Sequence, residues 1–286
     1  MNISIDQLNL LTLNVGLAHH NADWNWHDVS SPFTRIYLVT EGEASIVFPT
    51  GTYHLRKGYL YIIPAYTRHS YICKSRFSHY YLHLYEDREY STSLFEKYDF
   101  PVEVKAYKAD EQLMERMVAL APELKLPSSD PKSYDNRTTF IHDVQRLKQY
   151  DMAGRMEMRG INMIFISRFL PYIKEKPKVN DERIKQVLDY ISQNINEDIS
   201  VEQICQQICL SRGYFIALFK NTMGISPQQY VSKIKVERAQ LLLLTTPLSI
   251  KQIAYELGFV DHSYFTRLFH KVTGFTPQQY RGKNQI

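Results

Sequence analysis

The sequence lacks any long hydrophobic run and contains few cysteines. Its mean hydropathy is −0.35, and apolar stretches such as 161–170 and 241–244 fall short of the roughly 20 residues that a membrane-spanning helix needs. The first residues include no basic segment and no small-residue cleavage site, which argues against a secretory signal. Three cysteines (Cys73, Cys205 and Cys209), an odd number, indicate a reducing compartment without a disulfide framework. We therefore expect a cytoplasmic protein with no membrane partner.

Neither sign of charge dominates the chain. The 34 Lys and Arg residues exceed the 30 Asp and Glu residues by only four. Residues 1–180 contribute +1 of this excess (22 against 21), and residues 181–286 contribute +3 (12 against 9). The asymmetry permits an acidic partner for the C-terminal part, although a mildly basic solvated surface would give the same numbers. The ordinary globular composition and the length of 286 residues predict two domains.

Residues 1–90 are expected to form a β-barrel. Aromatic and β-branched residues dominate this part, and turn signals separate short runs of them. Many short strands at close spacing are typical of a sandwich or a barrel. The expected strands are 33–41, 44–48, 59–64, 69–73 and 79–85, with a turn at Glu41-Gly42-Glu43 between the first two.

Residues 91–176 are expected to form a helical segment. Apolar residues recur at three- and four-residue spacing in 111–120, 138–150 and 155–173, which is the pattern of amphipathic helices. A charged stretch with a proline then predicts an interdomain linker at 177–182. The remaining residues, 183–286, predict an all-α domain with short turns.

This C-terminal domain contains an internal repeat with a period of 50 residues. Residues 214–230 and 264–280 are identical at nine of 17 aligned positions, which is too many for composition alone. The identical pairs are Tyr214/Tyr264, Phe215/Phe265, Leu218/Leu268, Phe219/Phe269, Gly224/Gly274, Pro227/Pro277, Gln228/Gln278, Gln229/Gln279 and Tyr230/Tyr280. The protein therefore builds one helical unit twice.

Each copy carries the local signals of a helix-turn-helix. A side chain caps the start of the second helix, a glycine follows its end, and a proline begins the next helix. These residues are Ser211, Gly224 and Pro227 in the first copy and Asp261, Gly274 and Pro277 in the second. Short helices expected at 201–208 and 250–257 complete the two units, whose second helices suit a DNA major groove.

The outer face of the last capped helix separates two interpretations. A helical bundle without a ligand would show the same apolar periodicity. The outer face, however, consists of hydrogen-bonding side chains, and Arg, Ser and Thr are among the types that read base edges. These residues are His262, Ser263, Thr266, Arg267 and His270. We therefore favour DNA binding. A sequence-specific shift in the electrophoretic mobility of DNA on addition of the protein would distinguish the two interpretations.

The second copy also contains a specific sequence pattern. It reads Ile253-Ala254-x-x-x-Gly258-Phe259-x-Asp261-x-Ser263-Tyr264-Phe265-x-Arg267-x-Phe269, followed by Gly274, Pro277, Tyr280 and Arg281. The pattern resembles the signature of the AraC/XylS family of transcription regulators. The resemblance implies seven helices that form two homeodomain-like helix-turn-helix units, joined by a long central helix at 229–245.

The N-terminal part resembles the cupin-like sensor barrel of the same family, more weakly. The resemblance lies in 33–42 and in the pattern Lys57-Gly58-x4-Ile63-Pro64-x4-His69. It implies a small-molecule effector in the barrel and a dimerisation segment at 138–173. It also implies a homodimer that binds double-stranded DNA and contacts RNA polymerase, more often as an activator than as a repressor.

Base-reading positions are carried over from the family to both units. In the first unit they are Arg212, Gly213, Ile216 and Ala217, with Lys220 as a phosphate contact. The second unit has His262, Ser263, Thr266 and Arg267, with Lys271 as a further contact. The first unit departs from the family, whose members usually offer larger polar side chains, because Gly213 reads nothing and Ile216 reaches thymine methyls at best. We expect the first unit to position the protein and the second to read bases.

Cupin barrels also house metalloenzymes, so an enzyme fused to a DNA-binding tail is an alternative. A metal cupin needs a His-x-His pair, a following Glu and a further His. The sequence has His79-x3-His83 and the isolated His27, His54 and His69 instead. It also lacks a Gly-x-Ser-x-Gly elbow, a phosphate loop and an HExxH segment. We expect no catalytic residue, no metal and no cofactor.

Strand alternation predicts which side chains line the barrel. Arg35, Tyr37, Val39 and Glu41 share one strand face, and His79, Tyr81 and His83 share another. Aromatic walls with a few polar groups are typical of a small-molecule site, although a barrel core of satisfied Tyr and His side chains would look the same. The resemblance to sugar-responsive members places Tyr71, His79 and Tyr81 at or near the ligand. The predicted effector residues are His27, Arg35, Tyr37, Tyr71, His79 and Tyr81.

The sequence thus predicts a DNA-binding transcription regulator controlled by a small molecule, with a sugar as one candidate. An effector-free regulator controlled by a protein partner is the alternative. A rise in melting temperature with a metabolite separates the two, because a ligand of the native state stabilises it.

Overall fold

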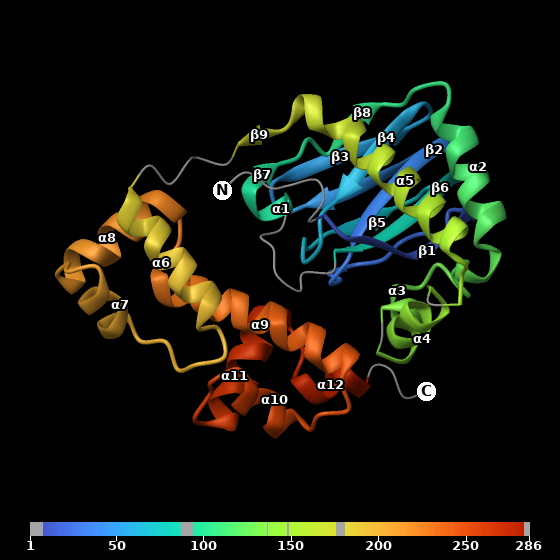
Figure 1. Cartoon of the computed structure of the whole chain (residues 1–286). Helices are drawn as coiled ribbons and strands as arrows, with labels where there is room; N and C mark the ends of the chain where they lie inside the picture. Colours follow the sequence, from blue (N-terminus) through green and yellow to red (C-terminus); the bar gives the residue numbers. More distant parts are fainter. Residues whose placement is uncertain (1–7, 87–93, 136, 148, 176–180, 283–286) are drawn as a thin grey trace. The chain divides into compact units, whose positions relative to one another are not determined.

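The computed structural model describes residues 8–86, 94–135, 137–147, 149–175 and 181–282 (Figure 1). The chain divides into two compact units, Met1–Lys176 (unit 1) and Pro177–Ile286 (unit 2). Unit 1 is rich in strands and cupin-like, and unit 2 is all-α, as the sequence predicts. Most of the predicted linker lies outside the described residues.

Unit 1 is built on one antiparallel sheet (Figure 1). Its strands are β1 (Leu10–Asn21), β2 (Thr34–Phe48), β3 (Gly51–Arg56), β4 (Tyr59–Ile63), β5 (Ser70–Ile72), β6 (Arg76–Glu86) and β8 (Glu103–Lys105). The strand order is β1-β6-β2-β4-β8, and β3 and β5 pair with the far half of β2. The sheet therefore continues through β8, past residue 90, where the sequence placed the end of the barrel.

Strand β2 is one bent strand, whereas the sequence predicted two strands and a turn. Its pairing with β6 shifts register between Val39 and Glu41. Gly42 has φ +70°, and a Cβ there would lie 2.0 Å from the carbonyl oxygen of Arg76. The bulge bends the strand, so its first half pairs with β4 and β6 and its second half with β3 and β5. Glu41 is consequently exposed and does not continue the inward face.

The helices of unit 1 follow or interrupt the last strands. They are α1 (Leu94–Lys97), α2 (Asp110–Leu120), the 3₁₀ turn η2 (Pro122–Leu124), α3 (Pro131–Tyr134), α4 (Arg137–Leu147), α5 (Met152–Phe169) and the 3₁₀ turn η3 (Leu170–Tyr172). The short strands β7 (Tyr98–Asp99) and β9 (Lys174–Glu175) pair with each other. Helix α5 starts earlier than predicted because the Asp151 side chain accepts a hydrogen bond from the Gly154 amide and caps it.

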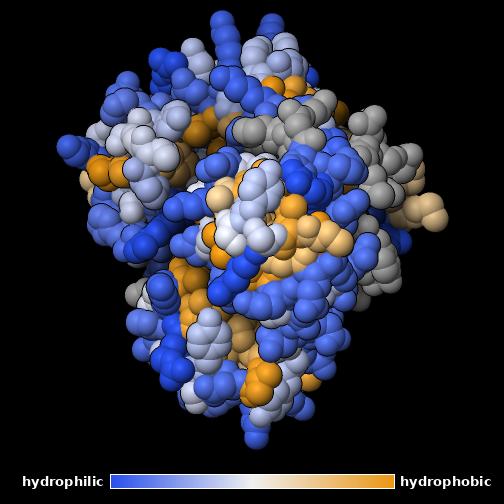
Figure 2. Space-filling view, turned by 90° about the vertical axis from the view of Figure 1, so that its left-hand side faces the viewer, coloured by the Kyte–Doolittle hydropathy of each residue, from blue (hydrophilic) through white to orange (hydrophobic). Residues whose placement is uncertain are grey.

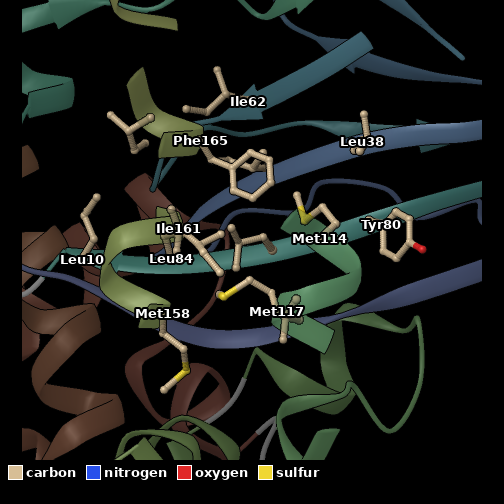
Figure 3. Packing of buried hydrophobic residues seen from close by; sticks show 14 of the residues in the cluster. Leu10, Leu38, Ile62, Tyr80, Leu84, Met114, Met117, Met158, Ile161 and Phe165 are labelled. Carbon is tan, nitrogen blue, oxygen red and sulfur yellow. The ribbon is translucent and has the colours of Figure 1, made fainter. Parts of the chain in front are cut away.

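The two faces of the sheet bury different side chains. One face contributes aliphatic residues such as Ile36, Leu38 and Leu82, which pack with Met114 of α2 and Phe165 of α5 (Figure 3). The opposite face contributes a second core, which is rich in tyrosine and includes residues that alternate with the first set along β2 and β6. Its aromatic members are Trp24, Tyr37, Phe48, Tyr61, Tyr71, Phe77 and Tyr81. The predicted alternation along β2 and β6 is thus present and separates an aliphatic face from an aromatic one.

The described part of unit 2 holds seven helices (Figure 1). They are α6 (Glu182–Gln193), α7 (Val201–Gln207), α8 (Arg212–Met223), α9 (Pro227–Thr245), α10 (Ile250–Glu256), α11 (His262–Thr273) and α12 (Pro277–Gly282). They form two separate hydrophobic cores, one around Phe215 and Phe219 and the other around Phe265 and Phe269. Helix α9 joins them, because its Val231 belongs to the first core and its Val236 to the second.

The exposed surface mixes residue types. On the face drawn in Figure 2 hydrophilic residues predominate, and hydrophobic residues form smaller groups among them. Across the described residues, no helix has the length and apolar character to cross a membrane.

Candidate functional site

Unit 1 contains a cavity of about 200 Å³ against the aromatic side of the sheet. Strands β1, β2 and β6, the segment after β1, the loop after η2 and helix α3 all contribute to its wall. The lining residues are Leu17, Ala18, His19, His20, Asp23, Trp24, Tyr37, His79, Tyr81, His83, Lys125, Leu126, Ser128, Ser129 and Tyr134.

Three of the six predicted effector residues, Tyr37, His79 and Tyr81, line this cavity. Tyr71 lies behind the wall, where its ring stacks on Trp24 with a centroid distance of 4.0 Å. His27 is exposed and lies outside the cavity, because Trp24 and Val29 of the same segment turn inward in its place. Its position therefore does not support the prediction made for His27.

Arg35 is buried beside the cavity and does not line it. Its Nη2 atom donates to the Ser31 hydroxyl at 2.6 Å, and that hydroxyl donates to the Asp135 carboxylate. The guanidinium also lies over the Phe33 ring, 4.7 Å from its centroid. Arg35 thus ties β2 to the end of α3, and we assign it a structural role in place of the predicted ligand contact.

A chain of hydrogen bonds runs from Tyr37 away from the cavity. The Tyr37 and Tyr71 hydroxyls lie 2.7 Å apart, and the Tyr71 hydroxyl lies 2.7 Å from Nε2 of His69. Nδ1 of His69 lies 2.7 Å from the Thr67 carbonyl oxygen. Because a carbonyl only accepts, Nδ1 carries the proton and Nε2 accepts from Tyr71. Tyr71 must then accept from Tyr37, so the hydroxyl protons of both tyrosines are used within the protein.

A second chain runs from His83 to helix α4. Nδ1 of His83 lies 3.2 Å from Oδ1 of Asn14, and Nδ2 of Asn14 donates to the Asp143 carboxylate at 2.8 Å. All three side chains are buried. Burial raises the pKa of Asp143 to about 6, against the opposite influence of the Asn14 hydrogen bond. The chain links a cavity residue to a helix 129 positions away from Asn14 in the sequence.

The buried histidines of unit 1 are neutral at pH 7. Burial lowers the pKa of His79 and His83 well below the usual value, and it lowers the pKa of His69 to about 3. Burial also lowers the pKa of His20, although Asp23 opposes this shift. The Nε2 atom of His20 and the Nδ1 atom of His79 are buried without a hydrogen-bond partner. The cavity wall is therefore polar and uncharged where these rings form it.

Close packing positions Tyr81 at the loop side of the cavity. Its hydroxyl accepts a hydrogen bond from the Leu126 amide at 2.9 Å. Gly16 of the neighbouring strand β1 pairs with Tyr81, and a Cβ at Gly16 would lie 2.3 Å from the Tyr81 hydroxyl oxygen. The Tyr81 side chain therefore occupies the space that a larger residue at position 16 would need. Sequence reasoning missed Gly16, the 125–129 loop and Tyr134, because no local pattern connects these residues to β6. The His79-x-Tyr81-x-His83 alternation did contain the signal for His83.

The described residues hold no group of three or more His, Cys, Asp or Glu side chains that is arranged to bind a metal ion. All three cysteines are free; Cys73 and Cys205 are buried, and Cys209 is exposed.

In unit 2 the sequence repeat becomes a structural repeat. Residues 211–220 and 261–270 have the same order of exposed, half-buried and buried positions. Phe215 and Phe219 point inward in the first unit, as Phe265 and Phe269 do in the second. Gly224 and Gly274, with φ +75° and +80°, end α8 and α11 as predicted. The outer faces of both helices are consequently open to the surroundings.

The predicted DNA contacts all lie on α8 and α11, and none is buried. Ile216 and Thr266 are half-buried, whereas the following residues are exposed: Arg212, Gly213, Ala217, Lys220, His262, Ser263, Arg267 and Lys271. The Thr266 hydroxyl donates to the His262 carbonyl oxygen at 3.0 Å, which leaves its oxygen as an acceptor. Two exposed aromatic residues, Tyr214 and Tyr264, occupy equivalent positions on the same helices and were not among the predicted DNA contacts.

The turns that precede α8 and α11 differ between the units. Asp261 caps α11 through a side-chain bond from the Ser263 amide, as predicted, whereas the Ser211 side chain makes no capping bond to α8. The turn of the second unit has Gly258 with φ +66°, and the matching position of the first unit has Cys209 with φ +52°. A Cβ on Gly258 would lie 2.3 Å from the carbonyl carbon of Glu197.

The same contact joins the two helix-turn-helix units. Glu197 follows α6 of the first unit, and its carbonyl oxygen accepts a 2.6 Å hydrogen bond from the Lys235 ammonium group of α9. Lys235 is buried and lies 5.0 Å from the centroid of the Phe259 ring in the second unit. The two hydrophobic cores do not merge, so they do not hold the two helix-turn-helix units together. The Lys235 contacts and the turn at Gly258 therefore add to α9 in fixing the spacing between these two helix-turn-helix units.

Comparison with known proteins matches each unit separately. Residues 9–121 match the family of AraC-like ligand binding domains, and residues 204–283 match a family of helix-turn-helix domains. Together the two matches cover more than half of the chain.

The relatives are transcription regulators. The chain is 31% identical over 81 residues to the lactose operon transcription activator of Staphylococcus xylosus, which covers 28% of this chain and 29% of that protein. It is 37% identical over 100 residues to the probable transcriptional regulator LumQ of Photobacterium leiognathi, which covers 34% of this chain and 39% of that protein. The chain thus matches well under half the length of either relative.

A solved structure has a similar fold over nearly the whole chain. It is ToxT from Vibrio cholerae with a bound unsaturated fatty acid, at 16% identity and a TM-score of 0.52, and the match covers 96% of this chain and 95% of that one. At this level of identity the likeness concerns the fold alone.

Proposed function

Because this chain belongs to the AraC/XylS family of transcription regulators, we propose that it binds specific DNA through α8 and α11 and responds to a small molecule in the cavity of unit 1. The observation that carries the DNA-binding part is the repeated outer face of these helices, which has the same exposure pattern twice in one chain. A ligand-free bundle has no reason to keep that face open in both copies.

The two faces differ chemically, which supports a division of roles. Arg212 of α8 pairs with Glu202 of α7, with Nε 3.2 Å from the carboxylate, and its neighbours Gly213 and Ala217 offer no hydrogen-bonding side chain. Arg267 of α11 lies 3.9 Å from the Asp261 carboxylate and is 71% exposed. Arginine that is held loosely and exposed suits bidentate contact with guanine. The helix-turn-helix unit with α8 then positions the protein on the DNA phosphates, and the helix-turn-helix unit with α11 reads bases.

Selection of bound duplexes from a random pool, followed by footprinting, tests the DNA-binding part. The two helix-turn-helix units of one chain should protect two adjacent major-groove segments of the DNA, about 34 Å or 10–10.5 bp apart. The half-site should be non-palindromic because the two faces differ. Protection of a single turn per protomer, or failure to select any sequence, contradicts the proposal.

Paired variants test the division of roles on the selected duplex. Replacing His262 and Thr266 with alanine should change base preference more than Ile216→Ala combined with Ala217→Gly. The proposed roles are wrong if the second pair abolishes recognition and the first is tolerated.

The regulatory part of the proposal concerns the cavity. Its aromatic wall with a few uncharged polar groups suits a small polar molecule, with a sugar as one candidate, and one relative is named for a lactose operon.

We extend the proposal to a cytoplasmic homodimer that forms through the helical segment of unit 1 and acts with RNA polymerase as an activator. Transcription in vitro from a promoter that carries the selected site, with and without a bound metabolite, tests whether the protein activates or represses. Sedimentation tests the dimer.

A further inference from the structure

Lys235 of α9 lies where the two helix-turn-helix units meet. It is 4% exposed, and its ammonium group donates to the Glu197 carbonyl oxygen at 2.6 Å and lies 5.0 Å from the centroid of the Phe259 ring. This one side chain therefore contacts the helix-turn-helix unit with α8 through Glu197 and the helix-turn-helix unit with α11 through Phe259.

Hydrophobic packing gives no reason for a lysine at this position. Helix α9 already contacts both hydrophobic cores, through Val231 before Lys235 in the sequence and through Val236 after it (Figure 1). Burial lowers the pKa of Lys235, although Asp198 and Glu197 oppose this shift, so the buried ammonium group carries a cost. Replacement of a buried ionic group by an apolar residue of similar volume is often neutral or stabilising, whereas the ionic group can select one arrangement of the parts that it joins.

Gly258 packs against the same backbone segment that Lys235 binds. A Cβ at Gly258 would lie 2.3 Å from the Glu197 carbonyl carbon and 2.7 Å from the Asp198 nitrogen, so this close approach requires a glycine. Gly258 stands three residues before Asp261, which caps α11. The contact therefore fixes the start of α11 relative to the helix-turn-helix unit with α8.

A change of one base pair in the spacing of a DNA site requires a large movement of one helix-turn-helix unit. Each base pair adds about 3.4 Å along the duplex and a rotation of about 35°. A movement of that size would break the 2.6 Å bond from Lys235 to Glu197 and separate Gly258 from the Glu197 backbone. Loss of a hydrogen bond from a charged group corresponds to about 10- to 100-fold in an equilibrium constant. A duplex with the wrong spacing should therefore meet this cost.

We propose that Lys235 is a positioning residue that determines the spacing specificity of the protein. It joins α9 to the Glu197 backbone and to the turn before α11. It thereby restricts binding to duplexes with one number of base pairs between the segment bound by α8 and the segment bound by α11. This role rests on the DNA binding proposed above for these two helices. Because Lys235 is buried, the role requires no contact between its side chain and DNA.

The binding test uses the full chain and the duplex obtained by selection from a random pool. One or two base pairs are added or removed between the two protected segments, and affinities are measured by fluorescence anisotropy. The wild-type protein should bind the altered duplexes at least about 10-fold more weakly than the selected duplex. Lys235→Met keeps the length of the side chain without the ammonium group. In this variant the ratio of the two affinities should fall by at least about 10-fold, because no bond has to be broken.

Lys233→Met is the matched control on the same helix. Lys233 is exposed, and its ammonium group lies 3.9 Å from the Glu237 carboxylate. This variant should keep the wild-type ratio. A substitution that only destabilises the fold lowers the affinity for all duplexes alike and leaves the ratio unchanged, so the ratio separates a positioning role from a merely structural one.

A measurement without DNA tests the junction itself. Nitroxide labels on Asn221→Cys of α8 and Val272→Cys of α11, two exposed positions outside the predicted DNA contacts, report the distance between these helices by pulsed electron paramagnetic resonance. The background variant Cys209→Gly removes the exposed cysteine, and the other two cysteines are buried. Dilution with unlabelled protein restricts the signal to distances within one chain. The distance distribution should have one narrow peak with Lys235, broaden in Lys235→Met and stay narrow in Lys233→Met.

Three outcomes overturn the inference. They are equal binding of all spacings by the wild-type protein, an unchanged affinity ratio or distance distribution in Lys235→Met, and a broad distance distribution in the wild-type protein. The wild-type distribution requires no substitution of Lys235 and therefore remains decisive if Lys235→Met does not fold. Failure to select any duplex would instead contradict the proposed function.

Discussion

Acidification should unfold unit 1 selectively, because its core contains histidines that stay neutral. His69, His79 and His83 titrate near 6.5 when unfolded, but burial lowers their pKa values in the folded state, that of His69 to about 3. Below pH 6.5 the unfolded chain therefore binds protons that the folded chain does not. The stability that these residues provide is complete above pH 6.5 and is lost as the pH falls toward the folded-state values.

The magnitude follows from the number of protons. Near pH 5 each of the three histidines contributes a difference of about one proton between the unfolded and folded states, worth about 1.4 kcal/mol per pH unit. Asp143 acts in the opposite direction, since burial raises its pKa to about 6 and the folded state protonates first. The net difference is at least about two protons, because the lowered pKa of His20 adds to it, so the free energy of unfolding should fall by at least about 3 kcal/mol per pH unit around pH 5.

Tryptophan fluorescence isolates this unit within the full chain. The protein has two tryptophans, Trp24 and Trp26, and both belong to unit 1. Urea unfolding is followed by their emission at a series of pH values between 7 and 5. In His79→Phe the slope against pH should decrease by about 1.4 kcal/mol per pH unit, whereas the exposed His27→Gln control should keep the wild-type slope. A free energy of unfolding that stays constant or rises toward pH 5 would refute this reasoning.

Further predictions concern unit 2. Gly258→Ala should destabilise α10 and α11 by at least about 2 kcal/mol, because φ is positive and the new methyl meets the Glu197 backbone; Cys209→Gly at the matching turn should leave stability unchanged or raise it by up to about 1 kcal/mol. Hydrogen exchange of these helices checks both, and equal effects would contradict the assigned contact. Arg267→Ala should cost about 1–3 kcal/mol and relax preference at one base pair, whereas Lys220→Ala should weaken binding to all duplexes alike. A panel of single-base substitutions separates these results, and a uniform loss for Arg267→Ala would make it a phosphate contact. With about four to six phosphates neutralised per protomer, log affinity should fall against log salt with a slope near −4 to −5; a flat dependence measured by footprinting would exclude this number of contacts.

The strands that form the cavity wall show which features could be predicted from the sequence. The period-two alternation in β6 placed His79, Tyr81 and His83 on one face, and the structure confirms it. The same rule failed for Glu41, because the bulge at Gly42 depends on the approach of Arg76 from another strand. Strand β1 was missed altogether, although it supplies four cavity residues and pairs with β6 along its whole length.

The sequence by itself determined unit 2 almost completely. Caps, glycine ends, apolar spacing and the repeat each depend on residues a few positions apart, so the chain specifies them locally, and Asp261, Gly224 and Gly274 take the predicted roles. Only the tertiary structure assembled the cavity of unit 1. Asn14, His83 and Asp143 come from β1, β6 and α4, and their contact requires the sheet to pair and the helix to pack before any hydrogen bond between them forms. Local signals recur along unit 2, which is why α8 and α11 could be predicted. Contacts between distant segments leave no such signal, so the parts of the cavity wall from β1, the 125–129 loop and Tyr134 could not.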